Sequence, residues 1–159
     1  MKRRFAKWVV AAAAILVFAN NGMGQGVRQA TVSEMKGNVQ VRIQGGEWQA
    51  AEVGMVLQEK DEIRTVEGSS AELLLDEGTS TGKIELLEKS HLKLSQMTVD
   101  GVTGEKTTAL DLALGKVLVH AEKLQGDSKF QVKTPTSIAG VKGTVFEVSV
   151  EEEKDRQPS

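Results

Sequence analysis

The stretch that decides the fold is residues 130–150, with the sequence FQVKTPTSIAGVKGTVFEVSV. Phe130 and Val132 alternate with polar residues at its start, and a second alternation of apolar and polar residues begins at Phe146. A period of two predicts half-buried β-strands, because successive side chains on a strand point to opposite faces. The stretch therefore predicts two strands joined by a connection that contains Pro and Gly.

The connection between these two strands predicts an ordered turn. Pro135 has no backbone N–H and pushes Thr134 toward extended geometry. Gly140 and Gly143 permit positive φ or a close approach of backbones. Because the conformation of a turn already explains the Pro and Gly residues here, a turn packed against the core is favoured over a ligand-binding loop.

Short alternating segments continue through the rest of the chain and are separated by turns that contain Gly, Ser and Asp. The segments are 39–43, 63–65, 71–75, 84–87 and 92–94. This spacing predicts an all-β domain. Two architectures remain open, an irregular solenoid-like stack of short strands and a sandwich.

Residues 110–121 fit two patterns. Leucine and valine positions there match one face of a helix, and they also match two strands broken at Gly115. The segment Gly37-Asn-Val-Gln-Val41 recurs as Gly115-Lys-Val-Leu-Val119, and this internal echo favours strands.

The residues quoted first resemble the FecR-domain family, in which F-x-V-x-T-P leads through a small-residue loop to G-T and then F-x-V-x-V. The positions that carry this resemblance are Thr134, Pro135, Gly140, Gly143, Thr144 and Phe146. Further positions extend it over residues 32–150, including Asp61-x-Ile63-x-Thr65. Two positions depart from the family pattern: Lys60 replaces a glycine, and Glu77 is inserted before Gly78.

The resemblance implies a non-catalytic module used for binding or scaffolding in the cell envelope, with signal transduction across the envelope as the family precedent. Regulators that name the family also carry a cytoplasmic segment, a membrane span and a receptor-docking domain. We do not expect these parts in this sequence.

Residues 1–24 have the organisation of a secretory signal peptide. Basic residues at positions 2, 3, 4 and 7 precede the apolar run 8–18, which is about half the ~20 residues that span a bilayer. Small residues then predict cleavage before Gln25. The sequence thus predicts a periplasmic or secreted protein with a β domain at 25–150, a charged flexible tail at 151–159 and no transmembrane segment after cleavage.

Composition narrows the classes of partner and site. Cleavage would remove four basic and no acidic residues, which changes the net charge from −2 to about −6. An acidic chain with three aromatic residues after position 24 does not favour nucleic acid. The chain has no cysteine, which excludes disulfides and zinc-thiolate sites.

No residue pattern predicts catalysis, a cofactor or a metal site. The two histidines, His91 and His120, lack the close spacing that would direct both imidazoles at one metal. Ser90 and His91 are neighbours on a predicted strand, so their side chains point to opposite faces. Carboxylates near the turns are expected to serve backbone hydrogen bonds.

Two interaction surfaces follow from the strand pattern. Lys89, His91 and Lys93 are expected on one strand face, which could meet an anionic glycan, and a solvated face is the plainer interpretation. The last strand, 146–150, is a candidate edge for strand addition by a protein partner. We therefore expect a binding or scaffolding module, with an envelope polysaccharide-binding or surface-layer component as the alternative.

Overall fold

The computed structural model describes residues 26–76, 82–121, 124–141 and 145–152. These residues form β-strands and no α-helix, which confirms the all-β prediction. The strands are β1 (Gly26–Val27), β2 (Ala30–Lys36), β3 (Val39–Arg42), β4 (Trp48–Ala50), β5 (Val56–Leu57), β6 (Glu62–Thr65), β7 (Ser70–Leu75), β8 (Lys83–Leu86), β9 (His91–Val99), β10 (Lys106–His120), β11 (Lys129–Lys133), β12 (Ile138–Val141) and β13 (Val145–Val150).

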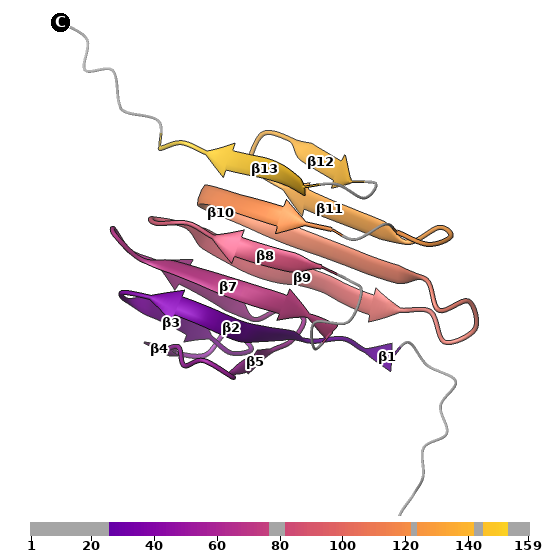
Figure 1. The fold of residues 1–159 in the computed structure, drawn as a ribbon, viewed down its shortest axis with the longest axis horizontal. Helices are drawn as coiled ribbons and strands as arrows, with labels where there is room; N and C mark the ends of the chain where they lie inside the picture. The colour runs from indigo at the N-terminus through magenta and orange to yellow at the C-terminus, as the bar shows by residue number, and fades with distance from the viewer. Residues whose placement is uncertain (1–25, 77–81, 122–123, 142–144, 153–159) are drawn as a thin grey trace, which may run out of the picture.

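The strands belong to one strongly curled sheet, whose two halves face each other across a common core (Figure 1). The first half-sheet contains β1, β3, β4, β6, β9, β11 and β12, and the second contains β2, β5, β7, β8 and β13. β10 belongs to both. All pairings are antiparallel except that of β10 with β11, which is parallel.

β10 joins the two half-sheets by bending at Gly115. Before the bend it pairs with β9 and β11, and after it with β8 and β13. The inward positions change from Leu110 and Leu112 to Val117 and Val119, so the bend shifts the alternation by one residue. The ambiguous segment is therefore a strand, as the internal echo predicted.

A glycine is required at this bend. Gly115 has φ +93°, and a Cβ placed there would lie 2.0 Å from the Ser90 Oγ and 2.4 Å from the Ser90 Cα. The Ser90 hydroxyl itself accepts a hydrogen bond from the Lys116 amide at 2.9 Å. The backbones of Gly115 and Ser90 can thus approach closely because Gly115 has no side chain and the Ser90 side chain is short.

The core is formed by the inward rows of both half-sheets. Its largest fully buried side chains are Phe130, Leu57, Ile63, Leu73, Leu75, Ile84, Leu86, Leu92, Leu94, Leu110, Leu112 and Val32. Near the carboxyl end, the Phe130 and Phe146 rings meet edge to face at a centroid distance of 6.3 Å and connect β11 to β13. The phenylalanines of the quoted stretch therefore tie the two half-sheets together.

The predicted turn between the last two strands is shorter than expected. It occupies 134–137, and residues 138–141 form β12, an added strand that pairs with β11. Gly140 lies within β12 and is not among the residues with positive φ, so the expectation of a turn glycine was wrong there. Gly143 and Thr144 lie outside the described residues.

The signal peptide predicted at 1–24 and residues 153–159 of the predicted tail also lie outside the described residues. Glu151 and Glu152, which begin that tail, are exposed. Within the part of the chain that the structure describes, no helix is long and apolar enough to cross a membrane.

Candidate interaction site at the carboxyl edge

Asp61, the first residue of the D-x-I-x-T pattern, holds two loops together. Its side chain is buried, Oδ2 accepts a hydrogen bond from the Gln58 amide at 2.8 Å, and Oδ1 accepts one from the Gln44 amide at 2.9 Å. A carboxylate that satisfies two backbone donors in this way stabilises the turns it connects. Asp61 therefore has a structural role.

The hydroxyl groups of the same region are also used internally. The Thr65 Oγ1 donates to the Leu87 carbonyl at 2.5 Å and accepts from the Ser90 amide at 3.1 Å. The Ser69 Oγ accepts from the Asn38 amide at 2.9 Å. These buried side chains hold neighbouring turns, so they are not directed at a ligand.

The backbone conformation of Lys60 explains why the family pattern has a glycine at this position. Its φ is +76°, a left-handed conformation that glycine adopts without steric cost. The preference for glycine at this position thus has a conformational cause, and the present chain keeps the turn with a lysine.

Thr134 and Pro135 organise the turn between β11 and β12. The Thr134 amide donates to the Ser137 carbonyl at 2.8 Å, and the Thr134 Oγ1 accepts from the Ser137 amide at 3.0 Å. Pro135 and Thr136 line a hollow together with Ser149 and Val150 of β13. The fold therefore brings the turn after the first strand of the quoted stretch close to the end of its last strand.

The structure does not gather Lys89, His91 and Lys93 into one ladder. His91 and Lys93 share the outward face of β9, but Lys89 precedes the strand, has φ +51° and pairs with Glu67 at 3.5 Å. The His91 Nε2 lies 3.4 Å from a carboxylate oxygen of Glu62. Acidic and basic groups are thus interleaved on this face.

Trp48 forms the centre of a cluster that sequence patterns did not predict. The guanidinium groups of Arg64 and Arg42 lie 4.0 and 5.0 Å from its ring centroid, and the His91 ring lies 5.4 Å away. Arg42 pairs with Glu62, and Arg64 donates to the Gln40 side chain at 2.6 and 2.8 Å. Since these groups bind one another, the cluster stabilises the outer face of the first half-sheet.

The second histidine lies on the other half-sheet. The His120 Nε2 lies 3.0 Å from a Glu85 carboxylate oxygen. The Lys83 ammonium, 3.0 Å from the same carboxylate, is the main cause that holds the pKa of Glu85 below its usual value, and His120 adds to it. In the described residues no group of three His, Asp or Glu side chains could hold a metal ion.

β13 pairs on one side only among the described residues. Its one partner is β10, with Val148 opposite Val117. The Leu87 amide donates to the Lys116 carbonyl at 3.0 Å, so the backbone groups of Lys116 face β8. The N–H and C=O groups of successive residues on an antiparallel strand point alternately to its two neighbouring strands, so the backbone groups of Val117 face β13.

The same alternation identifies the unpaired groups of β13. Val148 exchanges hydrogen bonds with β10, so the N–H and C=O of Glu147 and Ser149 point away from it. Both side chains are exposed. Within the part of the chain that the structure describes, β13 therefore presents unpaired donors and acceptors along one edge of the second half-sheet.

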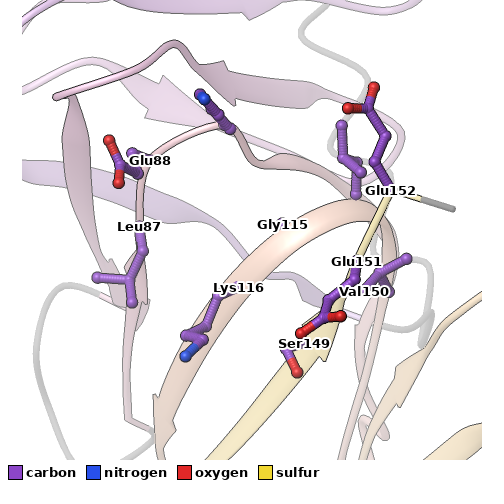
Figure 2. A pocket seen from close by; sticks show the side chains of 10 residues that line it. Leu87, Glu88, Gly115, Lys116, Ser149, Val150, Glu151 and Glu152 are labelled. Carbon is purple, nitrogen blue, oxygen red and sulfur yellow. The ribbon is translucent and has the colours of Figure 1, made fainter. Parts of the chain in front are cut away.

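A hollow of about 370 Å³ lies beside the carboxyl end of β13. Figure 2 shows Leu87 and Glu88 on one side of it and Val150 and Glu151 on the other, with the bend of β10 between them. This hollow and the hollow at Pro135 are both lined by Ser149 and Val150 at the carboxyl end of β13.

Comparison with known protein families shows which family the chain belongs to. The family model described as FecR protein matches residues 61–157, more than half of the 159 residues. The chain belongs to the FecR family. Its FecR domain is a β module of FecR-type signalling regulators. No curated protein and no solved structure matches the chain significantly.

The FecR match begins later than the resemblance noted above, which starts at residue 32. The strands before residue 61 are nevertheless part of the same fold, because β2 pairs with β7 and β3 pairs with β6. The match continues beyond β13 to residue 157 and includes the whole of the candidate edge.

Proposed function

We propose that this FecR-family chain is an exported, non-catalytic binding or scaffolding module that accepts a strand of a protein partner at the edge of β13. The observation that carries the proposal is the row of backbone groups at Glu147 and Ser149 that have no partner strand among the described residues. An extended segment that adds to a sheet gains its affinity from such main-chain hydrogen bonds.

β13 is the edge best suited to strand addition. In the described part of the chain, the other strands paired on one side only are β1, β4, β5 and β12, which contain two, three, two and four residues, whereas β13 contains six. Short edge strands offer little for another chain to pair with. Val145 on β13 is also about two-thirds exposed, which adds apolar surface at the edge.

Export and a role in signalling rest on different support. The basic residues and apolar run of residues 1–24 support secretion to the periplasm or beyond. Membership of the FecR family supports participation in signalling across the envelope. A module outside the cytoplasm that binds a partner strand is consistent with both.

The alternative, recognition of an anionic glycan through His91 and Lys93, has weaker support. Glu62 lies opposite Lys93 on β6, and Asp111 lies opposite it on β10. Carboxylates on both sides of the one lysine would repel an anionic ligand. The protein-partner proposal is therefore preferred.

Photo-crosslinking in the source cells tests this function. A photoreactive amino acid at Ser149 is expected to give a defined covalent adduct with a partner protein, while the same amino acid at exposed Ala50 on the β4 edge gives none. The adduct should be lost in Glu147→Pro, which removes a backbone donor, and kept in Glu147→Ala. Absence of an adduct at Ser149, or equal adducts at Ser149 and Ala50, would contradict the proposal.

A further inference from the structure

The two rows of β13 side chains differ sharply in character. Phe146, Val148 and Val150 face the core side, and Val148 is buried there. Val145, Glu147 and Ser149 are on the outward side, and Glu151 continues their spacing of two. A segment that pairs with this edge would therefore meet apolar residues with one row of its side chains, and with the other row a stretch that becomes acidic from Glu147 toward Glu151.

The acidic charge of this row is only partly neutralised. Glu147 pairs with Lys116 of β10 at 3.0 Å. Neither Glu151 nor Glu152 has an ion pair within the described part of the chain, and Glu88 lies across the hollow from them (Figure 2). Lys89 also lines the hollow but pairs with Glu67, so the acidic residues leave an excess of negative charge at the carboxyl end of the edge.

We propose that the segment that adds to β13 is a basic extended peptide, in which apolar residues alternate with Lys or Arg; this rests on the proposed function. Directly opposite side chains on antiparallel strands lie about 4.5–5.5 Å apart, so cations of the segment would face Glu147 and Glu151. Its apolar row would extend the core beside Phe146.

The strand that already pairs with β13 shows part of this complementarity. On β10, Leu118 lies opposite Glu147, Lys116 lies opposite Ser149 and binds Glu147 diagonally, and Val117 and Val119 are buried. A basic segment on the free side would give β13 similar neighbours on both sides.

A second copy of this chain is a poorer occupant. Antiparallel pairing of two β13 strands around a two-fold axis would bring Glu147 and Glu151 of both copies to one interface. Like charges on facing strands destabilise the pairing, and the net charge of the chain is already negative.

Fluorescence anisotropy with labelled peptides of about ten residues, long enough to cover β13, tests the inference. One peptide alternates Val with Lys, a second Val with Thr and a third Val with Glu. A fourth has the composition of the first with Val and Lys in two separate blocks. The proteins are the wild type, the double variant Glu147→Lys/Glu151→Lys, and Ser149→Pro. A control double variant, Glu47→Lys/Glu52→Lys, makes the same change of charge at exposed positions away from the edge.

We expect the Val/Lys peptide to bind the wild type about tenfold more tightly than the Val/Thr peptide at low salt, and the Val/Glu peptide to bind most weakly. The tenfold preference should disappear in Glu147→Lys/Glu151→Lys and persist in Glu47→Lys/Glu52→Lys. Binding of both favoured peptides should fall in Ser149→Pro, and circular dichroism would verify that this variant is folded.

Three outcomes would overturn the inference. Equal binding of the Val/Lys and Val/Thr peptides would remove the requirement for cations, and loss of both in Ser149→Pro would still support strand addition. Binding of the block peptide as tightly as the alternating one would mean attraction by charge without strand pairing. Failure of every peptide to bind would reject a basic strand, while a Ser149 adduct in the crosslinking experiment would still support the proposed function.

Discussion

The body of the fold, defined as β2 to β9 with their connections, and the carboxyl edge, defined as β11 to β13 with residues 151–152, use polar groups in opposite ways. In the body, Asp61, Thr65 and Ser90 are buried and bonded to backbone groups. In the described residues of the carboxyl edge no polar side chain is buried, and backbone groups of β13 are left unpaired.

This difference separates two features of the molecule. The polar residues of the family pattern belong to the body, and the surface proposed for a partner belongs to the carboxyl edge. A buried polar group must find a partner inside the protein, because leaving it without one costs roughly 1–3 kcal/mol. An exposed edge has no such requirement and can exchange water for another strand. Side-chain patterns therefore identify the body, whereas main-chain geometry supports the proposed site.

Gly115, at the junction of the two regions, should give the largest effect on substitution. Gly115→Ala introduces a Cβ 2.4 Å from the Ser90 backbone, together with the cost of a positive φ. We expect a loss of about 3 kcal/mol or more in the free energy of unfolding, measured by urea denaturation.

Gly104→Ala is the matched control for Gly115→Ala. Gly104 also has positive φ, +73°, but no atom lies within 4 Å of a Cβ placed there. It should lose only about 1 kcal/mol, which is the conformational part alone. Equal losses in the two variants would mean that the close approach of β10 to Ser90 does not join the two regions as described.

Lys60 tests whether the body tolerates a strained turn because its polar contacts hold it. Lys60→Gly should raise the free energy of unfolding by about 1 kcal/mol, since glycine relieves the positive φ at +76°. Lys60→Ala removes the same side chain and keeps the strain, so it should give no gain. If Lys60→Ala stabilised the protein as much as Lys60→Gly, the effect would come from the side chain and the conformational explanation would be wrong.

Most strands could be predicted from the sequence, because a strand produces a local alternation of apolar and polar residues. The alternation at Phe130 and Val132 predicted β11, and Gly115 predicted the interruption within residues 110–121. β12 was missed since residues 138–141 are few and contain Gly140, which weakens a strand pattern.

The proposed site depends on strand pairings that no local sequence pattern encodes. The edge of β13 was proposed from its terminal position, but which backbone groups are unpaired follows only from the register with β10. The Trp48 cluster combines β3, β4, β6 and β9, whose side chains are separated by up to about fifty positions in the sequence. Such juxtapositions arise from the order of strands in the sheet, which alternation alone does not determine.

The smallest effect is expected from Glu85, an outward carboxylate of the body that has the ion partners Glu151 lacks among the described residues. Lys83, which also binds Glu72, and His120 hold the pKa of Glu85 below the usual 4.5. A carboxyl group with a lowered pKa in the folded state stabilises the protein above its unfolded pKa, and this contribution is lost as the pH falls through the folded value.

Glu85→Gln should therefore lower Tm slightly at pH 7, and the difference from the wild type should shrink as the pH falls below about 4.5. Exposed Glu34→Gln is the control, because Glu34 has no ion pair within the described residues and should show a smaller, flatter difference. Thermal melts of the three proteins between pH 7 and pH 3 measure this. If the Tm difference between Glu85→Gln and the wild type stayed constant with pH, the outward charges of the body would contribute no more to folding than those of the carboxyl edge. The contrast between the two regions would then hold for buried groups alone.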